Sequence, residues 1–223
     1  MAPKFWQVKR KGFPFILSAN PGPYAKDKCY PIGIILRDVL NVCNSLHEAK
    51  MVMNSGFIQI DGITRRDVHF GVGIMDVINI IPNGESYRLI PKDLNVLIPI
   101  KTKEKDVKLL KITSKVSIKG SKLQYGFHDG KTLISEQALR VGDTCLLELP
   151  EAKIKDHVKF DKGCTVFIVK GENAGKVGMV EDIRDGIFSL PKRALVTIGD
   201  RAVELPVEMV MAVGADKPVI KVN

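Results

Sequence analysis

The sequence predicts a multidomain α+β protein in which two short helices near the N-terminus are followed mainly by β-strands. Three observations support this fold class. Apolar residues between 34 and 53 recur at helical spacing, apolar and polar residues alternate from 94 onwards, and glycine-containing turns separate the later apolar runs. The chain has 223 residues, 45% of them hydrophobic, so it can bury more than one core. We expect two or three small domains.

Residues 31–66 encode the helical part. In the first helix we expect one buried face, with Arg37 and Asn41 turned away; that face consists of Ile34, Ile35, Leu36, Val39 and Leu40. Ser45-Leu46-His47-Glu48 has the form of a capping box, in which Glu48 reaches back to the cap. The second helix then places Leu46, Ala49, Lys50 and Met53 on one side.

Glycine turns predict hairpins after these helices. Gly56 is placed to end the second helix in a left-handed turn, and Asp61-Gly62 follows the strand 57–60 as a two-residue hairpin turn. A second hairpin, turning at Asn83-Gly84, would complete the first sheet. Asp76 lies inside its apolar strand, where we expect a turn or sheet-edge hydrogen bond rather than catalysis.

The middle section, 93–160, is predicted to be a small β-barrel. Ile112, Val116 and Ile118 would face inwards, with Lys111, Lys115 and Lys119 as an outer cationic row. Such a row of lysines is expected either to contact the phosphates of single-stranded nucleic acid or simply to be solvated. His128-Asp129-Gly130 has no nucleophile or metal spacing beside it, so a hairpin turn between 123–127 and 131–135 is expected.

The last section, 161–223, contains alternating strands and one glycine-rich turn. Gly171 and Gly175-Lys176 are unlike a phosphate-binding P-loop, because three residues separate the glycines and Val177 replaces the Ser or Thr that would bind magnesium. Gly175 is expected in the turn with positive φ. Pro191-Lys192-Arg193 is a loop whose charge contacts either RNA or water.

The positive charge is concentrated in two parts of the chain. The net charge is +9, with about +5 in residues 1–30, zero in 31–92, +4 in 93–160 and zero in 161–223. This favours a polyanionic partner such as nucleic acid. The basic, aromatic first 30 residues either lie along RNA or pack on the nearest domain, and Trp6 is expected to be a packing anchor.

Neither a metal site nor a membrane segment is encoded. The cysteines, Cys29, Cys43, Cys145 and Cys164, lie far apart without C-x-x-C spacing and are expected to be small core residues. The four histidines show no ligand spacing, and no apolar run approaches the ~20 residues needed to span a bilayer. We therefore expect a soluble, cytoplasmic protein with reduced thiols, no cofactor and no small-molecule substrate.

Two segments resemble known RNA-associated modules. The helix pair with GFIQIDGITRRD (residues 56–67) resembles the S-four-type RNA-binding module, and residues 161–183 resemble the KOW motif, a hairpin of an SH3-like barrel. In order, the parts resemble the archaeal and eukaryotic small-subunit ribosomal protein of the S-four-e type. Further motifs carry this resemblance: Gly73-Ile74-Met75-Asp76-Val77, Phe127-His128-Asp129-Gly130, Phe160-Asp161-Lys162-Gly163 and Asn173-Ala174-Gly175-Lys176. Members usually begin with a longer basic stretch than the one found here.

This resemblance implies four parts: an arm (1–30), an S-four-like RNA-binding domain (31–92), a central β domain (93–160) and a KOW barrel (161–223). It also implies a structural constituent of the small ribosomal subunit that binds its rRNA and contacts neighbouring ribosomal proteins, without catalysis. The expected RNA contacts are Lys4, Lys9, Arg10, Lys11, Lys26, Lys28, Arg37, Asn41, Ser45, His47, Lys50, Arg65, Arg66, Lys115, Lys119 and Lys122. Two alternatives remain open at this point. One is an RNA-modifying enzyme that uses the S-four-like part as a tether, and the other is a KOW-containing transcription elongation factor.

Overall fold

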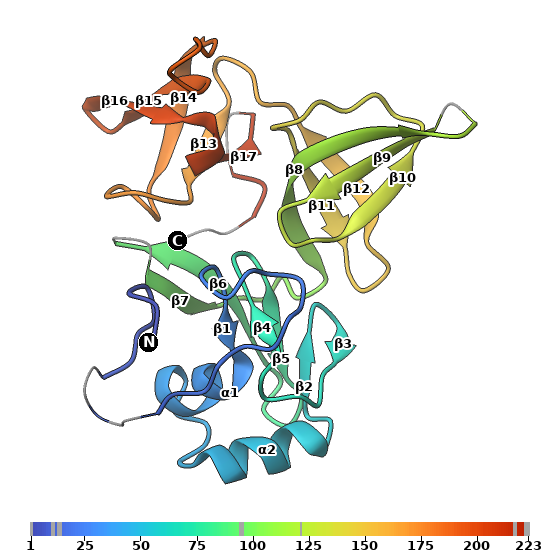
Figure 1. Ribbon diagram of the computed structural model, residues 1–223, viewed down its shortest axis with the longest axis vertical. Coiled ribbons are helices and arrows are strands. Elements are labelled where there is room, and N and C mark those ends of the chain that lie inside the picture. The colour runs from blue at the N-terminus through green and yellow to red at the C-terminus, as the bar shows by residue number, and fades with distance from the viewer. Residues whose placement is uncertain are drawn as a thin grey trace. The chain divides into compact units, whose positions relative to one another are not determined.

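The computed structural model (Figure 1) describes residues 2–9, 12, 15–93, 96–120, 122–215 and 218–220. By its packing the chain divides into two compact units. The first consists of Met1–Ile90, Val96–Lys108 and Leu149–Glu151, and the second of Pro91–Asn95, Leu109–Glu148 and Ala152–Asn223. The described chain is rich in β-strands arranged in several sheets, which agrees with the predicted multidomain, β-rich character.

The first unit combines a small helical layer with a sheet in the order β3-β2-β5-β6-β7 and a separate β1–β4 pair. Its elements are β1 (Tyr30–Pro31), α1 (Ile32–Ile34), η1 (Ile35–Val39), α2 (Leu46–Asn54), β2 (Ile58–Ile60), β3 (Ile63–Thr64), β4 (Gly71–Val72), β5 (Val77–Ile80), β6 (Glu85–Lys92) and β7 (Val96–Lys101). The alternating run that begins at residue 94 was predicted to open the central section, but its residues Val96–Lys101 instead form β7, the edge strand of this sheet. Leu94 lies outside the described residues.

The first predicted helix is short, and its second half is wound more loosely than an α-helix. One turn of α-helix, α1, passes into the π-turn η1, where the Leu40 amide donates to the Ile35 carbonyl at 2.8 Å. The turn ends at Asn41, whose φ of 53° is in the left-handed region that Asn tolerates better than most residues. The predicted apolar face is nevertheless correct, because Ile34, Ile35 and Leu36 are buried.

Helix α2 begins at the predicted cap. The Ser45 hydroxyl accepts from the Glu48 amide at 3.2 Å, whereas the Glu48 carboxylate accepts from the Asn44 amide at 2.8 Å, one residue before the expected position. Ala49 and Met53 are buried on the inner side, but Lys50 is exposed, so its predicted place on that side is wrong. Gly56 ends the helix with φ 76°, as predicted.

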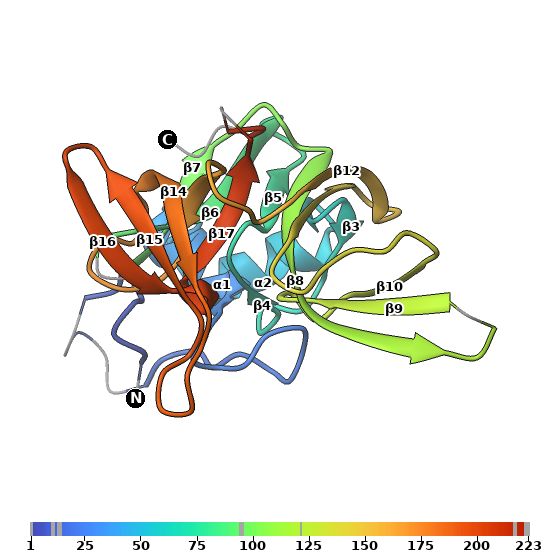
Figure 2. The same cartoon turned by 90° about the horizontal axis from the view of Figure 1, so that it is seen from above.

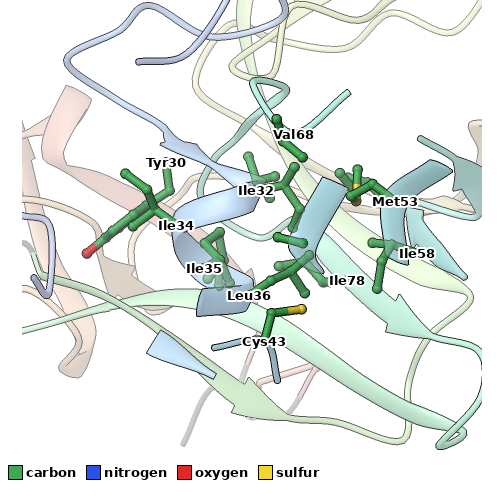
Figure 3. Packing of buried hydrophobic residues seen from close by; sticks show 14 of the residues in the cluster. Tyr30, Ile32, Ile34, Ile35, Leu36, Cys43, Met53, Ile58, Val68 and Ile78 are labelled. Atoms are coloured by element: carbon green, nitrogen blue, oxygen red, sulfur yellow. The ribbon is translucent and has the colours of Figure 1, made fainter. Parts of the chain in front are cut away.

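The core of the first unit lies between these helices and the sheet (Figure 3). Ile32, Leu36, Met53, Ile58 and Ile78 converge there from α1, η1, α2, β2 and β5. The N-terminal segment joins this core as well. The Trp6 indole is buried and stacks on Tyr30 with ring centroids 5.4 Å apart, while its Nε1 donates to the Cys29 carbonyl at 2.9 Å. The prediction that Trp6 is a packing anchor is confirmed.

The polar part of the first unit is organised around Lys108, at the start of β8 (Val107–Ile118), whose first two residues belong to this unit. Its Nζ contacts the Asp61 carboxylate at 2.7 Å and also pairs with Asp76, and all three side chains are buried. Asp76 accepts from the Gly73 amide at 2.8 Å, which confirms the predicted turn hydrogen bond, and from the Tyr24 hydroxyl at 2.6 Å. Because burial outweighs the attraction of Lys108, the pKa of Asp76 rises to about 6. One ammonium between two carboxylates leaves a buried net charge of −1 whenever both are ionised.

The second unit contains two five-stranded sheets. The central sheet has the order β10-β9-β8-β11-β12, and the C-terminal sheet β16-β15-β14-β13-β17. Their elements are β8 (Val107–Ile118), β9 (Lys122–Phe127), β10 (Thr132–Ser135), β11 (Thr144–Glu148), β12 (Lys153–Val158), β13 (Thr165–Ile168), β14 (Val177–Arg184), β15 (Arg193–Ile198), β16 (Arg201–Pro206), η2 (Val207–Met209) and β17 (Val210–Gly214). Each sheet has its own buried cluster.

A bulge in β8 overturns the predicted row of lysines. The register with β9 shifts between Ile112 and Ser114, so the alternation reverses beyond this point. Lys115 consequently pairs with the buried Tyr125, while Val116 is 56% exposed instead of facing inwards. Before the bulge, Lys111 is mostly buried rather than part of an outer row. Its Nζ donates to the carbonyls of Val207 and Val210 at 2.6 and 2.7 Å, which joins the two sheets of this unit.

The predicted turns of the second unit are present. Gly130 (φ 78°) closes the β9–β10 hairpin by donating to the Phe127 carbonyl at 3.1 Å. Gly175 (φ 89°) closes the turn before β14 and donates to the Ile168 carbonyl at 2.9 Å. A Cβ at Gly175 would also lie 2.6 Å from the Pro91 carbonyl oxygen, so glycine is required here for space as well as for backbone conformation.

Candidate nucleic-acid interface

The outer face of α2 carries one of the predicted contact groups. His47, Lys50 and Asn54 are exposed and follow one another at spacings of three and four residues, so they share one stripe of the helix. Asn41 and Ser45, which precede α2, are also exposed, but the Ser45 hydroxyl is engaged as the cap. The stripe therefore presents an ammonium, an imidazole and an amide to solvent, groups that suit phosphate and base edges.

The predicted arginines of the first unit differ in how freely they present charge. Arg37 forks onto Asp38 with bonds of 2.8 and 2.7 Å, and this hydrogen bonding raises the pKa of the guanidinium. The Arg65 guanidinium lies over the Phe70 ring, 4.5 Å from its centroid, and is partly buried. Arg66 is exposed. Of the three, Arg66 is the most accessible to a polyanion.

The N-terminal segment lies along the loop that follows Arg66. The Asn20 amide nitrogen donates to the Asp67 carboxylate at 3.0 Å, and the His69 ring Nδ1 lies 2.8 Å from the Ser18 carbonyl oxygen. Lys4, Lys9, Lys26 and Lys28 are exposed, whereas Arg10 and Lys11 lie outside the described residues. The aromatic anchor of the segment packs on the domain while four of its lysines face solvent, so packing is confirmed for Trp6 and contact with RNA stays a prediction.

The predicted contacts in the second unit lie on β8 and the adjoining hairpin. Lys119 and Lys122 are exposed on either side of the turn between β8 and β9. Lys115 is exposed too, but its ammonium donates to the Leu139 carbonyl at 3.0 Å and approaches the Tyr125 ring to 5.7 Å from its centroid. Lys119 and Lys122 are therefore freer to meet an anion than Lys115.

Nothing in the described ranges adds reactive chemistry to these cations. The four cysteines are buried, and burial raises the pKa of Cys29 to about 11 and that of Cys145 to about 12, so neither is an activated thiolate. Their predicted role as small core residues is confirmed by this burial. Among the residues described, no group of three or more His, Cys, Asp or Glu is placed to hold a metal ion. In the same residues, no helix has the length and apolar character needed to cross a bilayer.

Comparison with known proteins gives one consistent family. The model of the ribosomal family S4e matches residues 83–154. The small ribosomal subunit protein eS4 of Pyrobaculum islandicum is 36% identical over 232 residues, covering 100% of this chain and 96% of that protein. The eS4 protein of Aeropyrum pernix is 35% identical, covering 98% of this chain and 91% of its own length. This chain belongs to the eS4 family of small ribosomal subunit proteins.

A solved structure supports the same relationship. The crystal structure of the 30S ribosomal protein S4e from Thermoplasma acidophilum aligns with a TM-score of 0.69 and 29% sequence identity, covering 84% of this chain and 95% of that one. The eS4 family is structural and non-enzymatic, so the predicted family and the predicted absence of catalysis are both correct. The RNA-modifying enzyme and the elongation factor are not supported.

Some features of this surface could not be found by sequence reasoning. The pairing of Arg37 with Asp38 could have been predicted, because the two residues are adjacent in the sequence. The stacking of Arg65 on Phe70 could not, because it depends on how the chain turns after β3. The β8 bulge that redirects Lys115 leaves no glycine or proline signal at residue 113. The exposed apolar hairpin tip at 187–190 was not predicted either, since the predicted loop covered only Pro191-Lys192-Arg193.

Proposed function

We propose that this eS4 family member binds the RNA of the small ribosomal subunit through two cationic surfaces, one in each unit. The α2 surface consists of Asn41, His47, Lys50 and Arg66 with the exposed lysines of the N-terminal segment, Lys4, Lys9, Lys26 and Lys28. The β8–β9 surface consists of Lys119 and Lys122. Neighbouring small-subunit proteins are the further partners expected of such a constituent.

The observation that carries this proposal is the two-sided character of α2. Its inner side, with Ala49 and Met53, is fully buried in the core, so the outer stripe is held rigidly on the domain. A rigid stripe with an ammonium and an imidazole suits the fixed spacing of a folded RNA backbone. Such contacts recognise RNA shape and release counterions on binding.

We further propose that residues 31–92 form an S-four-like module and residues 161–223 a KOW-type barrel. Support for the first comes from the helix pair leading into the β2–β3 hairpin at Asp61 and Gly62, both with positive φ. Support for the second comes from the antiparallel β13–β14 pair closed by the Gly175 turn. Between them, strands β8 to β12 form one sheet with a separate core around Tyr125 and Leu147, which supports a small central β domain that begins after β7.

The salt dependence of rRNA affinity tests the α2 surface. The affinity of the purified full chain for small-subunit rRNA would be measured between 50 and 300 mM salt, for the wild type and for Lys50→Ala with Arg66→Ala. Each lost phosphate contact lowers the slope of log K against log salt by about 0.7–0.9, so the double variant should lose about 1.5. Adding Arg37→Ala to the double variant should lower the slope by less than the ~0.7–0.9 expected for a phosphate contact, because Asp38 already balances the charge of Arg37.

A matched control separates a specific surface from general loss of charge. Lys101 is exposed in the same unit and already pairs with Glu85, so Lys101→Ala removes a charge of the same sign away from α2. Its slope should stay near that of the wild type. If the double variant and Lys101→Ala gave equal slopes, the α2 surface would not be the contact.

A further inference from the structure

The hairpin between β14 and β15 ends in an apolar tip made of Ile187, Phe188, Ser189 and Leu190, here called the Phe188 tip. Ile187 and Leu190 exchange two backbone hydrogen bonds of 2.9 Å, so Phe188 and Ser189 form a closed two-residue turn. In Figure 2 this loop, drawn in orange, projects beyond the strands of its own sheet. The turn therefore holds the aromatic ring at the very end of a braced hairpin.

The side chains of this tip are exposed to an unusual degree for their type. Phe188 is fully exposed, Ile187 is 72% exposed and Leu190 is 41% exposed. Single apolar residues on a surface are ordinary, but three together at one projecting point form a patch that marks an interaction site. The backbone is already fixed, and a Cβ at Gly186 would lie only 3.0 Å from the Leu190 carbonyl oxygen. Binding would thus cost little additional ordering of the chain.

The charged residues around the tip are already paired within this chain. Lys192 lies 2.9 Å from Asp185, and Glu204 lies 3.5 Å from Arg184 and 3.8 Å from Arg193. These charged groups lie at the base of the hairpin, so an apolar tip is bordered by polar groups, as in protein–protein contacts. Together the three cations and two carboxylates carry a net charge of +1, and each cation lies within 4 Å of a carboxylate.

We propose that the Phe188 tip inserts into an apolar pocket of a neighbouring protein of the small ribosomal subunit. An unpaired RNA base could stack on Phe188, but RNA offers no comparable apolar cover for Ile187 and Leu190, and the cations at the base of the hairpin already have carboxylate partners. A protein pocket buries all three side chains together, with the aromatic ring as the anchor. This inference rests on the family assignment and is independent of the proposed RNA-binding surfaces.

Site-specific cross-linking tests the class of partner directly. The full chain carrying the photoreactive p-benzoylphenylalanine at position 188 would be incorporated into small subunits of its own organism, irradiated, and analysed for products after nuclease digestion. We expect a covalent product with a second small-subunit protein. A product with rRNA, a product between two copies of this chain, or no product would each overturn the proposal. The same residue placed at Asp200, in the exposed β15–β16 turn, provides the control and should not yield that protein product.

A substitution measures how much the tip contributes. Phe188→Ser should leave the unfolding midpoint unchanged, because the ring is fully exposed. Its affinity for naked small-subunit rRNA should also match the wild type, while its affinity for subunits depleted of this protein should fall at least about tenfold, as expected for an aromatic anchor. Equal affinity for depleted subunits would refute the proposed insertion. Weakened binding to naked rRNA would assign the tip to RNA instead. If the proposal of RNA binding through the α2 surface were wrong, this would be seen in a different experiment, as an unchanged salt dependence of rRNA affinity for the variant with Lys50→Ala and Arg66→Ala.

Discussion

Replacing Lys108 by methionine removes the ammonium that stands between two buried carboxylates. Asp61 and Asp76 would keep their backbone donors, the amides of Val77 at 3.1 Å and Gly73 at 2.8 Å, but would lose their shared counter-charge. Removing one partner of a buried ion pair usually costs about 3–5 kcal/mol, because it leaves an uncompensated buried charge. We expect Lys108→Met to lie within this range at pH 7.5.

The cost should depend on pH in a defined direction. In the wild type the pKa of Asp76 is raised to about 6 from 3.8, so between these values the folded state binds more protons than the unfolded state. The stabilisation linked to that proton is fully present below pH 3.8 and is lost as the pH rises through 6. Without Lys108 the attraction that holds the pKa of Asp76 down is gone, so this carboxyl group keeps its proton to higher pH. The deficit of the variant should therefore be largest near pH 8 and shrink towards pH 5.

Urea unfolding, followed by fluorescence of Trp6 in the core of the first unit, measures this effect. With a urea m-value of about 2 kcal/mol/M, a loss of 3–5 kcal/mol lowers the midpoint by about 1.5–2.5 M. Lys105→Met, at an exposed position three residues earlier in the chain, is the control and should shift the midpoint very little. A deficit below about 1 kcal/mol that stayed constant from pH 5 to pH 8 would refute the reasoning, since it would mean that Lys108 does not balance the two acids.

Three further outcomes follow from individual contacts. Burial lowers the pKa of Lys111 to about 8 from 10.5, so between these pH values the unfolded state binds one more proton than the folded state. The stability of the wild type relative to Lys111→Met should therefore rise by up to about 3 kcal/mol as the pH increases through this range. Equal pH profiles of the two proteins would contradict this. Gly175→Ala should lower the free energy of unfolding, measured by thermal denaturation, by at least about 2 kcal/mol more than Gly163→Ala. Both glycines have positive φ, but only a Cβ at Gly175 would clash with the Pro91 carbonyl. Equal losses of stability would show that the loop moves to accommodate the Cβ. All four cysteines should resist a thiol reagent in the native protein and react in denaturant, and rapid native labelling would contradict their burial.

Features encoded by neighbouring residues were predictable from the sequence. The Ser45 cap, the Gly56 helix end and the Asp61-Gly62 turn each depend on a few adjacent residues whose backbone preferences agree. The Gly175 turn was predictable for the same reason, although its second requirement, the close approach of Pro91, was not. Local backbone chemistry thus suffices wherever the constraint itself is local.

Features that depend on distant partners could not be predicted. Asp76 pairs with a lysine 32 residues further along the chain, and nothing in the apolar run around it indicates that partner. The edge strand β7 has the same alternating pattern whether it opens a new domain or completes the first sheet, and only its pairing decides. The β8 bulge inserts one residue without a sequence signal and so reverses the side-chain pattern beyond it.

The lysines of β8 show why net charge does not map the binding surface. The middle section owes its positive balance to lysines, yet Lys108 is consumed by two buried carboxylates and Lys111 by two carbonyl groups. Among the described residues of this strand and its hairpin, Lys119 and Lys122 are exposed beyond the bulge, whereas the ammonium of the exposed Lys115 donates to the Leu139 carbonyl. A lysine whose ammonium is already paired inside the folded protein does not neutralise a phosphate, so it releases no counterion when RNA binds. The number of salt-sensitive contacts should therefore follow the exposed lysines of the N-terminal segment, α2 and the β8–β9 turn, and should be smaller than the composition of the chain suggests.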